Sequence, residues 1–340
     1  MSTAISFDPC ASSLTGIERR SGVSTQEFMD KYLYPWQPVV LTDAAAEWPA
    51  LTRWTLDFFR EQFGDRSIRV RRGQKHYKTT VGAHVNYIEA CSRAGAKSSE
   101  KPRYYLRNIT IGDEFPELLN DFDVPATCLP NWLERWPLKL LFPLGPKSSA
   151  ELFMGPPGAS VPVIHRDKNM THSWLSQILG RKRLWLISPL QTDLMYQDPS
   201  DPDHSMVNSP NDPDLEHFPA FARAQVASCV LEPGDTIFLP AGWWHAVECT
   251  TASISISGNF ANGSNFGAFR DMTVLPAFRG GRAKALLNRT LLDCHRVICG
   301  LEDTLKSPSR LSPGVKRLAA KQASSGSRRY WNGQSQGRPD

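Results

Sequence analysis

Two histidines and one aspartate stand where they can bind a single metal ion. His165 and Asp167 lie two residues apart at the end of an expected β-strand, so their side chains point to the same face. His245 follows 78 residues after Asp167, at the start of another expected strand. Two imidazoles and one carboxylate on one side of a metal leave the opposite side open. That arrangement suits Fe(II), which would bind an organic co-substrate there and then oxygen.

The His165–Asp167 pair is a weak motif when it is taken alone. With 34 acidic residues in 340, about one of the eight histidines would have a carboxylate two positions later by chance. A single strand histidine is more often a packed core residue. The metal site is favoured because the pair ends a strand and because Trp243 and Trp244 precede His245, where they would shield a metal from water.

Lys182 is the second residue that could do chemistry. It opens an expected strand in QILGRKRLWLISP and alternates inward with Leu184 and Leu186. A buried ammonium group needs an anionic partner because its desolvation is costly, and a dicarboxylate co-substrate would supply one. The alternative is an ordinary surface lysine between Arg181 and Arg183.

The elements that must position these residues begin near residue 150, where short strands follow one another closely. We expect eight of them: ELFMG, SVPVIH, SWLSQIL, KRLWLIS, VASCVLEP, DTIFLP, WWHAVEC and SISISGNF. Such a series favours a mainly β fold, a double-stranded β-helix or jelly roll. In the last strand Ile254 and Ile256 point one way, and the polar residues point the other way. The polar residues are Ser253, Ser255, Ser257 and Asn259. They form either the inner wall of a barrel or a solvent-facing row.

An α/β lead-in precedes the barrel. Ser24 and Glu27 form a capping box at the start of an expected helix over residues 24–36. Further helices are expected over 55–64 and 84–95, and strands over 38–42, 67–73 and 104–110. We therefore divide the chain into a flexible N-terminus and a jelly-roll domain, followed by a helix and a basic disordered tail. The bounds are 1–20 for the N-terminus, 21–280 for the domain (lead-in 21–145, barrel core 150–262), 281–305 for the helix and 306–340 for the tail.

A long insert over residues 190–222 carries seven acidic residues and no Lys or Arg. If it overhangs the barrel mouth, it would favour a cationic substrate; otherwise it is a solvated acidic loop remote from the site. After the barrel, an apolar stripe marks the helix over 282–305. The stripe consists of Leu287, Leu291, Cys294, Ile298, Leu301 and Leu305. It would either pack on its own domain or form a homodimer seam.

The bulk composition is that of a soluble globular protein, with 41% hydrophobic and 21% charged residues. No secretory signal or membrane span is evident, so we expect a cytoplasmic protein with no membrane partner. Seven cysteines without a Cys-x-x-Cys pair indicate buried thiols rather than a disulfide framework. The net charge of +5 comes from the tail over 306–340, which holds eight basic residues against Asp340 alone. That tail would either contact RNA, the ribosome or another polyanion, or stay solvated with no specific partner.

Taken together, the motifs resemble the JmjC/cupin-like Fe(II)- and 2-oxoglutarate-dependent oxygenases. The motifs are FMGPP, IHRD, QILGRK, PGDTIFLPAGWWH and SISGNF. Within that family the chain most resembles the lysyl hydroxylase/arginine demethylase branch. FMGPP, the GWWH turn and Asn259, fourteen residues after the last histidine, carry this likeness. The resemblance covers about residues 34–262.

The resemblance implies His165, Asp167 and His245 as catalytic iron ligands and Lys182 as the cation that holds the distal carboxylate of 2-oxoglutarate. It implies further co-substrate contacts from Tyr105, Thr171, Ser173, Ser257 and Asn259. Ser173 departs from the family, where many relatives have an asparagine, because serine is shorter and lacks the amide donor. Thr171 and His172 could compensate. We expect His172 to pack or to support the site rather than to bind the metal.

The implied reaction consumes 2-oxoglutarate and O2, releases succinate and carbon dioxide, and hydroxylates a substrate C–H bond. We hypothesise a protein or peptide substrate, with Lys or Arg favoured by the acidic insert. N-demethylation by the same chemistry and hydroxylation of a tRNA base or a small molecule remain alternatives. A non-redox metal-binding cupin or a partner-binding barrel is an alternative of another class. Lys182 with Tyr105 argues against it, because such a protein needs no 2-oxoglutarate clamp.

Overall fold

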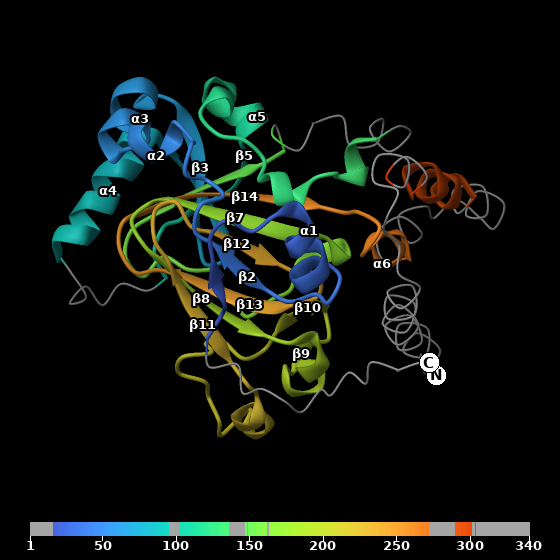
Figure 1. Ribbon diagram of the computed structural model, residues 1–340. Helices are drawn as coiled ribbons and strands as arrows, with labels where there is room; N and C mark the ends of the chain where they lie inside the picture. The colour runs from blue at the N-terminus through green and yellow to red at the C-terminus, as the bar shows by residue number, and fades with distance from the viewer. Residues whose placement is uncertain are drawn as a thin grey trace, which may run out of the picture.

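A large sheet forms one wall of the molecule, with its strands in the order β1-β2-β12-β7-β14-β6-β5 (Figure 1). β1 and β2 pair in parallel, and the other neighbours in this sheet pair antiparallel. The strands are β1 (Arg19–Arg20), β2 (Val39–Leu41), β5 (Leu106–Thr110), β6 (Glu151–Gly155), β7 (His172–Leu179), β12 (Thr236–Leu239) and β14 (Ser253–Phe260). The computed structural model describes residues 16–94, 102–135, 147, 149–161, 163–271, 290–300 and 303.

A smaller antiparallel sheet faces the large one and closes the double-stranded β-helix. Its order is β11-β8-β13, from β11 (Ala227–Leu231), β8 (Lys182–Ile187) and β13 (Trp244–Cys249). The interior between the sheets is apolar at one level, where side chains of both sheets meet: Val40, Leu175, Leu184, Leu186, Leu231, Ile237, Leu239 and Val247. Seven of the eight expected barrel strands are present, which confirms the jelly roll. SVPVIH instead makes only isolated bridges at Ser160 and His165.

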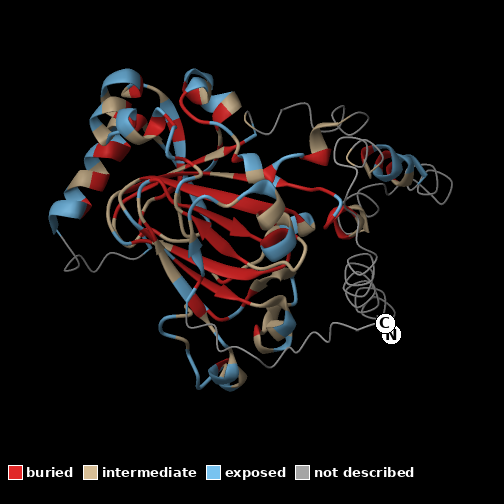
Figure 2. Cartoon of the chain, in the orientation of Figure 1, coloured by how far each residue is buried: buried red, intermediate tan, exposed pale blue. Residues whose placement is uncertain are grey.

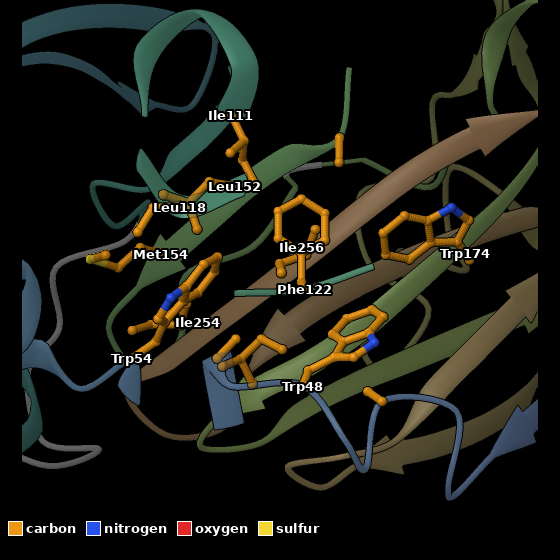
Figure 3. Close-up of a cluster of buried hydrophobic side chains, with 14 of the residues drawn as sticks. Trp48, Trp54, Ile111, Leu118, Phe122, Leu152, Met154, Trp174, Ile254 and Ile256 are labelled. Atoms are coloured by element: carbon orange, nitrogen blue, oxygen red, sulfur yellow. The ribbon is translucent and has the colours of Figure 1, made fainter. Parts of the chain in front are cut away.

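The N-terminal helices cover the outer face of the large sheet and form the main core with it (Figure 1). Trp48, Trp54 and Phe122 pack there against Trp174 of β7 and Ile254 of β14 (Figure 3). The strands are buried along most of their length, whereas the helices expose one side (Figure 2). Side chains alternate between the two faces of a strand. Every second residue of β7 and β14 therefore points into the barrel, and the residues between them point into the outer core.

Two helices of the lead-in begin at side-chain caps that their sequences indicate. The Ser24 hydroxyl accepts from the Glu27 amide at 3.1 Å, and Thr55 caps the next amphipathic helix in the same way. The helices are α1 (Thr25–Phe28), η1 (Met29–Leu33), α2 (Ala50–Arg53), α3 (Leu56–Phe63), α4 (Val81–Ala94), α5 (Ile111–Glu114), η3 (Pro116–Asn120), η4 (Ala126–Cys128) and η5 (Trp132–Glu134). The later ones are η7 (Lys168–Met170), η8 (Pro189–Leu194), η9 (Pro219–Arg223) and α6 (Phe266–Phe269).

Two smaller hairpins complete the described fold. β3 (Ser67–Arg72) pairs with β4 (Lys75–Thr80), and β3 lies beside β5 through the bridge between Arg71 and Tyr105 (Figure 1). β9 (Gln197–Asp198) pairs with β10 (Asp201–Ser205) inside the long insert. The sequence reasoning missed β4, because KHYKTT lacks the apolar alternation that marks a half-buried strand.

Two expectations about the ends of the chain need correction. Arg19 and Arg20 belong to strand β1 rather than to a flexible terminus, because their backbone pairs with Val40 and Leu41. In the helix after the barrel, Leu291 and Ile298 are exposed. The helix packs on its own domain through another face, that of Leu292, His295 and Cys299. Leu287, Leu301, Leu305 and the tail over 306–340 lie outside the described residues.

No helix in the described part of the chain combines the length and the apolar character that crossing a lipid bilayer requires.

Candidate metal centre and co-substrate pocket

His165, Asp167 and His245 meet at one end of the barrel. One ligand atom from each lies within 4.8 Å of the others. The Nε2 atom of His245 is 3.8 Å from a carboxylate oxygen of Asp167, and the two imidazole centroids are 4.3 Å apart. The backbones of the two histidines are held together by a reciprocal pair of hydrogen bonds, at 2.9 and 2.7 Å. The pairing of strand β13 with the segment before Asp167 therefore sets the spacing of the three groups.

Both histidines face the centre with the same ring nitrogen. His165 Nδ1 lies 3.2 Å from the Val163 carbonyl, and His245 Nδ1 lies 3.1 Å from the Trp243 carbonyl. A carbonyl accepts only, so each Nδ1 carries the proton and each Nε2 keeps its lone pair for a metal. Burial, followed by the nearby His245, lowers the pKa of His165 to about 3, so this ring is neutral at physiological pH.

Asn259 orients the carboxylate of Asp167. Its side-chain amide donates to Asp167 Oδ2 at 3.5 Å and to the Thr171 hydroxyl at 2.8 Å. Thr171 therefore supports the centre from behind and does not line the cavity. Ser173 and Ser257 do line it, with Asn259 and the three candidate ligands. The cavity has a volume of about 120 Å³, which is room for a small polar molecule.

Lys182 is fully buried among neutral groups. Its ammonium donates to the Tyr105 hydroxyl at 3.1 Å and to the Ser255 hydroxyl, and lies 5.2 Å from the Phe153 ring centre. Burial lowers its pKa from the ordinary lysine value. Phe153 also lines the cavity of the three candidate ligands, so the ammonium lies behind one wall of that cavity. A buried cation with only hydroxyl partners fits an anionic carboxylate.

Gly155 explains why the FMGPP segment contains a glycine. A side-chain carbon at this position would lie 2.6 Å from the Tyr105 ring and 2.8 Å from Ala159. The ring of Tyr105 therefore rests directly on the backbone of β6, with its hydroxyl at Lys182. Gly155 is needed because it lets Tyr105, which is hydrogen-bonded to Lys182, pack closely on β6.

His172 does not bind the metal. Its Nε2 atom lies 2.8 Å from the Ser264 hydroxyl, and its Nδ1 atom accepts from the Ala241 amide at 2.9 Å. Its ring packs on Phe238 and Phe260 on the outer side of the sheet. Both ring nitrogens are thus used, and the packing role expected from the sequence is confirmed.

The sequence reasoning missed several residues that line the cavity. Arg107, Asn108 and Glu151 do so, from the neighbouring strands β5 and β6. A bulge between Leu106 and Ile109 turns Arg107 and Asn108 to the cavity side together. Burial and the nearby Asp167 raise the pKa of Glu151. Arg107 and Asn108 sit in a strand that is read from the sequence only for its apolar pattern, which does not indicate a bulge. In the structure Asn108 has a positive φ of 58° at the bulge.

The acidic insert does not overhang the cavity as a free negative surface. Its apolar residues Met195, Val207 and Phe221 pack on the outer face of the small sheet, against Trp185 and Trp244. The insert does reach the candidate metal centre through β10, whose His204 ring lies 5.9 Å from the His165 ring.

The acidic groups of β10 are paired. Asp203 forms an ion pair with Arg166 at 2.7 Å, and Asp201 forms one with Lys168 at 3.0 Å. The charge of these two acidic residues, out of seven in the insert, is thus neutralised by the residues on either side of Asp167.

Comparisons with known proteins agree with this geometry. The model of the cupin-like domain family matches residues 25–266. The chain is 30% identical to "Lysine-specific demethylase JMJ21" of Arabidopsis thaliana over 77% of its length, and 27% identical to "Lysine-specific demethylase 8" of Xenopus tropicalis over 73%. It is 28% identical over 63% of its length to "tRNA wybutosine-synthesizing protein 5" of Danio rerio. The chain belongs to the cupin-like domain family.

The chain spans only part of these relatives. It covers 28% of the Arabidopsis protein, 54% of the Xenopus protein and 65% of the zebrafish protein. Their names differ in what they act on, and the shared part is the barrel that carries the candidate metal centre. Membership of the family therefore does not fix the substrate.

Proposed function

We propose that this chain is an Fe(II)- and 2-oxoglutarate-dependent oxygenase that hydroxylates a side chain of a protein or peptide. The buried ammonium of Lys182 carries the proposal, because within the described residues it is hydrogen-bonded only to hydroxyl groups and lies behind the cavity that the three candidate ligands line. A cupin that only binds a metal or a partner has no use for a buried cation at that place. The dicarboxylate explains it.

In this proposal each residue has one task. His165 and His245 bind the iron through Nε2, and Asp167 binds it through its carboxylate, which Asn259 holds in place. Lys182 fixes the distal carboxylate of 2-oxoglutarate. Bound Fe(II) supplies the oxidation of a substrate C–H bond, with O2 and 2-oxoglutarate as co-substrates. The aromatic and aliphatic walls of the barrel exclude water from the reacting groups.

Lysine and arginine are the first side chains to test as the oxidised residue. Relatives of this chain are named lysine-specific and arginine-specific demethylases. Glu151 lines the cavity and offers a carboxylate to a cationic side chain. The two acidic residues of β10 add nothing to this choice, because Asp201 and Asp203 are paired. N-demethylation would follow from the same chemistry on a methylated side chain.

The test is to incubate the purified chain with Fe(II), 2-oxoglutarate and a cell lysate, and to measure succinate and protein masses together. We expect Fe(II)-dependent succinate and a mass gain of one oxygen atom on a substrate protein, both absent with Asp167→Ala. Formaldehyde release with loss of a methyl group would identify demethylation instead. If no succinate forms with lysate and Fe(II) present, the chain is a binding protein and the proposal is wrong.

A further inference from the structure

The hairpin of β3 and β4 presents a cationic face with no acidic residue in it. Ile68 and Val70 are buried, so strand alternation turns Arg69 and Arg71 to the opposite face. The register places Lys78 opposite Arg69 and His76 opposite Arg71. Cross-strand neighbours on one face lie close together, so two pairs of basic side chains are held side by side.

This arrangement is unfavourable by itself. Like charges directly opposite each other destabilise a two-stranded sheet. Within the described residues, Arg69, Arg71 and Lys78 form no ion pair with an acidic side chain. A carboxylate that acts on this face is that of Glu151 in the cavity wall, whose pKa burial raises and Arg71 and Arg107 lower in part. The positive potential of this face acts on His76. Its pKa is lowered chiefly by Arg71, with smaller contributions from its burial, Arg107 and Arg69. An anionic partner would remove this repulsion.

The cationic face continues into the cavity of the candidate metal centre. Arg71 forms an antiparallel bridge with Tyr105, the residue before β5, so Arg69 and Arg71 share the face of this segment that carries Tyr105 and Arg107. Tyr105 and Arg107 face the barrel interior. The guanidinium of Arg107 donates to the Gly73 carbonyl at 3.1 Å and thereby ties the hairpin turn to the cavity wall. Burial and the nearby Arg71 lower its pKa to about 10, so it stays charged at neutral pH.

We propose that this hairpin face, defined by Arg69, Arg71, His76 and Lys78, binds the phosphate backbone of an RNA strand beside the cavity. The proposal goes beyond the proposed function, because it concerns what docks beside the cavity and not the reaction. Nucleic-acid binding draws its affinity from phosphate contacts, which Arg69, Arg71 and Lys78 of this face can provide. A peptide interface of similar strength would need buried aromatic or aliphatic anchors, and this face offers none.

The test measures binding of a fluorescein-labelled, mixed-sequence single-stranded RNA about a dozen nucleotides long to the full chain by fluorescence anisotropy at several salt concentrations. No Fe(II), 2-oxoglutarate or substrate protein is added, so the result does not depend on the oxygenase reaction. The key variant is the double substitution R69Q/K78Q, which neutralises one cross-strand pair. The matched control is R183Q/R296Q, which removes two exposed charges elsewhere.

We expect R69Q/K78Q to weaken RNA binding at least ~10-fold and to reduce the log–log salt slope by about 1.4, from two lost phosphate contacts on a single strand. The control should change binding less than about 2-fold, within the range of screened surface charges. Each single variant should show part of the loss, and thermal unfolding should show that all variants are folded.

Two outcomes would overturn the inference. If R69Q/K78Q binds RNA as tightly as the unmodified chain, the contact lies elsewhere, for example in the basic segment over 306–340. If a polyglutamate of equal charge binds as tightly as the RNA and loses the same affinity in R69Q/K78Q, the hairpin face binds acidic protein segments and not RNA.

Discussion

The ammonium of Lys182 lies 3.1 Å from the phenolic oxygen of Tyr105, a residue 77 positions earlier in the chain. The lead-in thus reaches into the closed end of the barrel and completes the surroundings of its buried cation. No carboxylate of the described residues is hydrogen-bonded to this ammonium. The account depends on this pair, because it makes the barrel a receptor for an anion.

Replacing Lys182 by methionine should weaken 2-oxoglutarate binding. Hydrogen bonds to charged groups contribute about 1.5–3 kcal/mol, so the KM for 2-oxoglutarate should rise by roughly 10- to 100-fold. Burial lowers the pKa of Lys182, so the unmodified chain should lose affinity as pH rises, at a lower pH than an ordinary lysine titrates. Steady-state succinate production against 2-oxoglutarate concentration and pH checks both points. A pH profile equally steep in Lys182→Met would show that another group is responsible.

The same pKa shift has a consequence for stability. Because the folded state binds the Lys182 proton less tightly than the unfolded chain, this residue makes the ligand-free protein more stable as pH rises from its lowered pKa toward about 10.4. Below that window the buried charge costs stability. Lys182→Met should lack this contribution, which urea unfolding at several pH values would reveal.

Gly155→Ala should disturb the co-substrate pocket through Tyr105. The added carbon would lie 2.6 Å from the tyrosine ring, so the ring must move away from Lys182. We expect a loss of about 1–3 kcal/mol in unfolding free energy, as for other overpacked sites, and a rise in the KM for 2-oxoglutarate larger than the fall in kcat. Gly267→Ala is the control, because a side-chain carbon there has no neighbour within 4 Å. Equal effects of both substitutions would contradict the packing argument.

Asp203→Asn should loosen the insert beside the candidate metal centre. The ion pair between Asp203 and Arg166 is largely buried, with 18% and 17% of the side chains exposed. Leaving one partner unpaired should cost about 1–3 kcal/mol of stability and weaken metal binding through the neighbouring His165. Asp212→Asn, at an exposed acid of the same insert, should be neutral within about 0.5 kcal/mol. Chemical unfolding and metal titration of both variants would decide the matter.

The homodimer suggested by the helix after the barrel remains a prediction. Leu291 and Ile298 are 49% and 41% exposed on this helix, and a second copy of the chain would cover them. The double variant L291D/I298D should then sediment as a monomer of 38.0 kDa, whereas the unmodified chain should sediment at twice that mass. A monomeric unmodified chain would exclude the seam.

The barrel and the three candidate ligands were predictable because strand alternation is a local rule. It placed His165 with Asp167 on one face, and it left Lys182, Ser257 and Asn259 facing either inward or outward, of which the structure shows the inward arrangement. The role of Tyr105 came from resemblance, because no local pattern indicates that a lead-in strand reaches the far end of the barrel. The position of the Tyr105 hydroxyl at Lys182 depends on the close packing of the Tyr105 ring against Gly155.

The errors arose where a side chain's partner lies far away in sequence. The insert appeared free and acidic because Arg166 and Lys168 come some 35 residues before their partners. The helix packs on the domain through a face that the stripe does not include, because His295 counts as polar in the sequence, whereas a hydrogen bond from its ring to the Trp132 carbonyl lets it be buried. Long-range ion pairs and buried polar groups are not visible in hydrophobic periodicity.

Metal binding by the chain and by Asp167→Ala is the most direct test of the central claim, that His165, Asp167 and His245 hold one ferrous ion. Anaerobic titration with Fe(II), with Mn(II) as a redox-stable substitute, would be paired with succinate production. The account predicts one metal per unmodified chain, and for Asp167→Ala at least ~100-fold weaker binding with turnover below about 1%, since it removes a direct ligand. Stoichiometric metal and undiminished turnover in Asp167→Ala would contradict it.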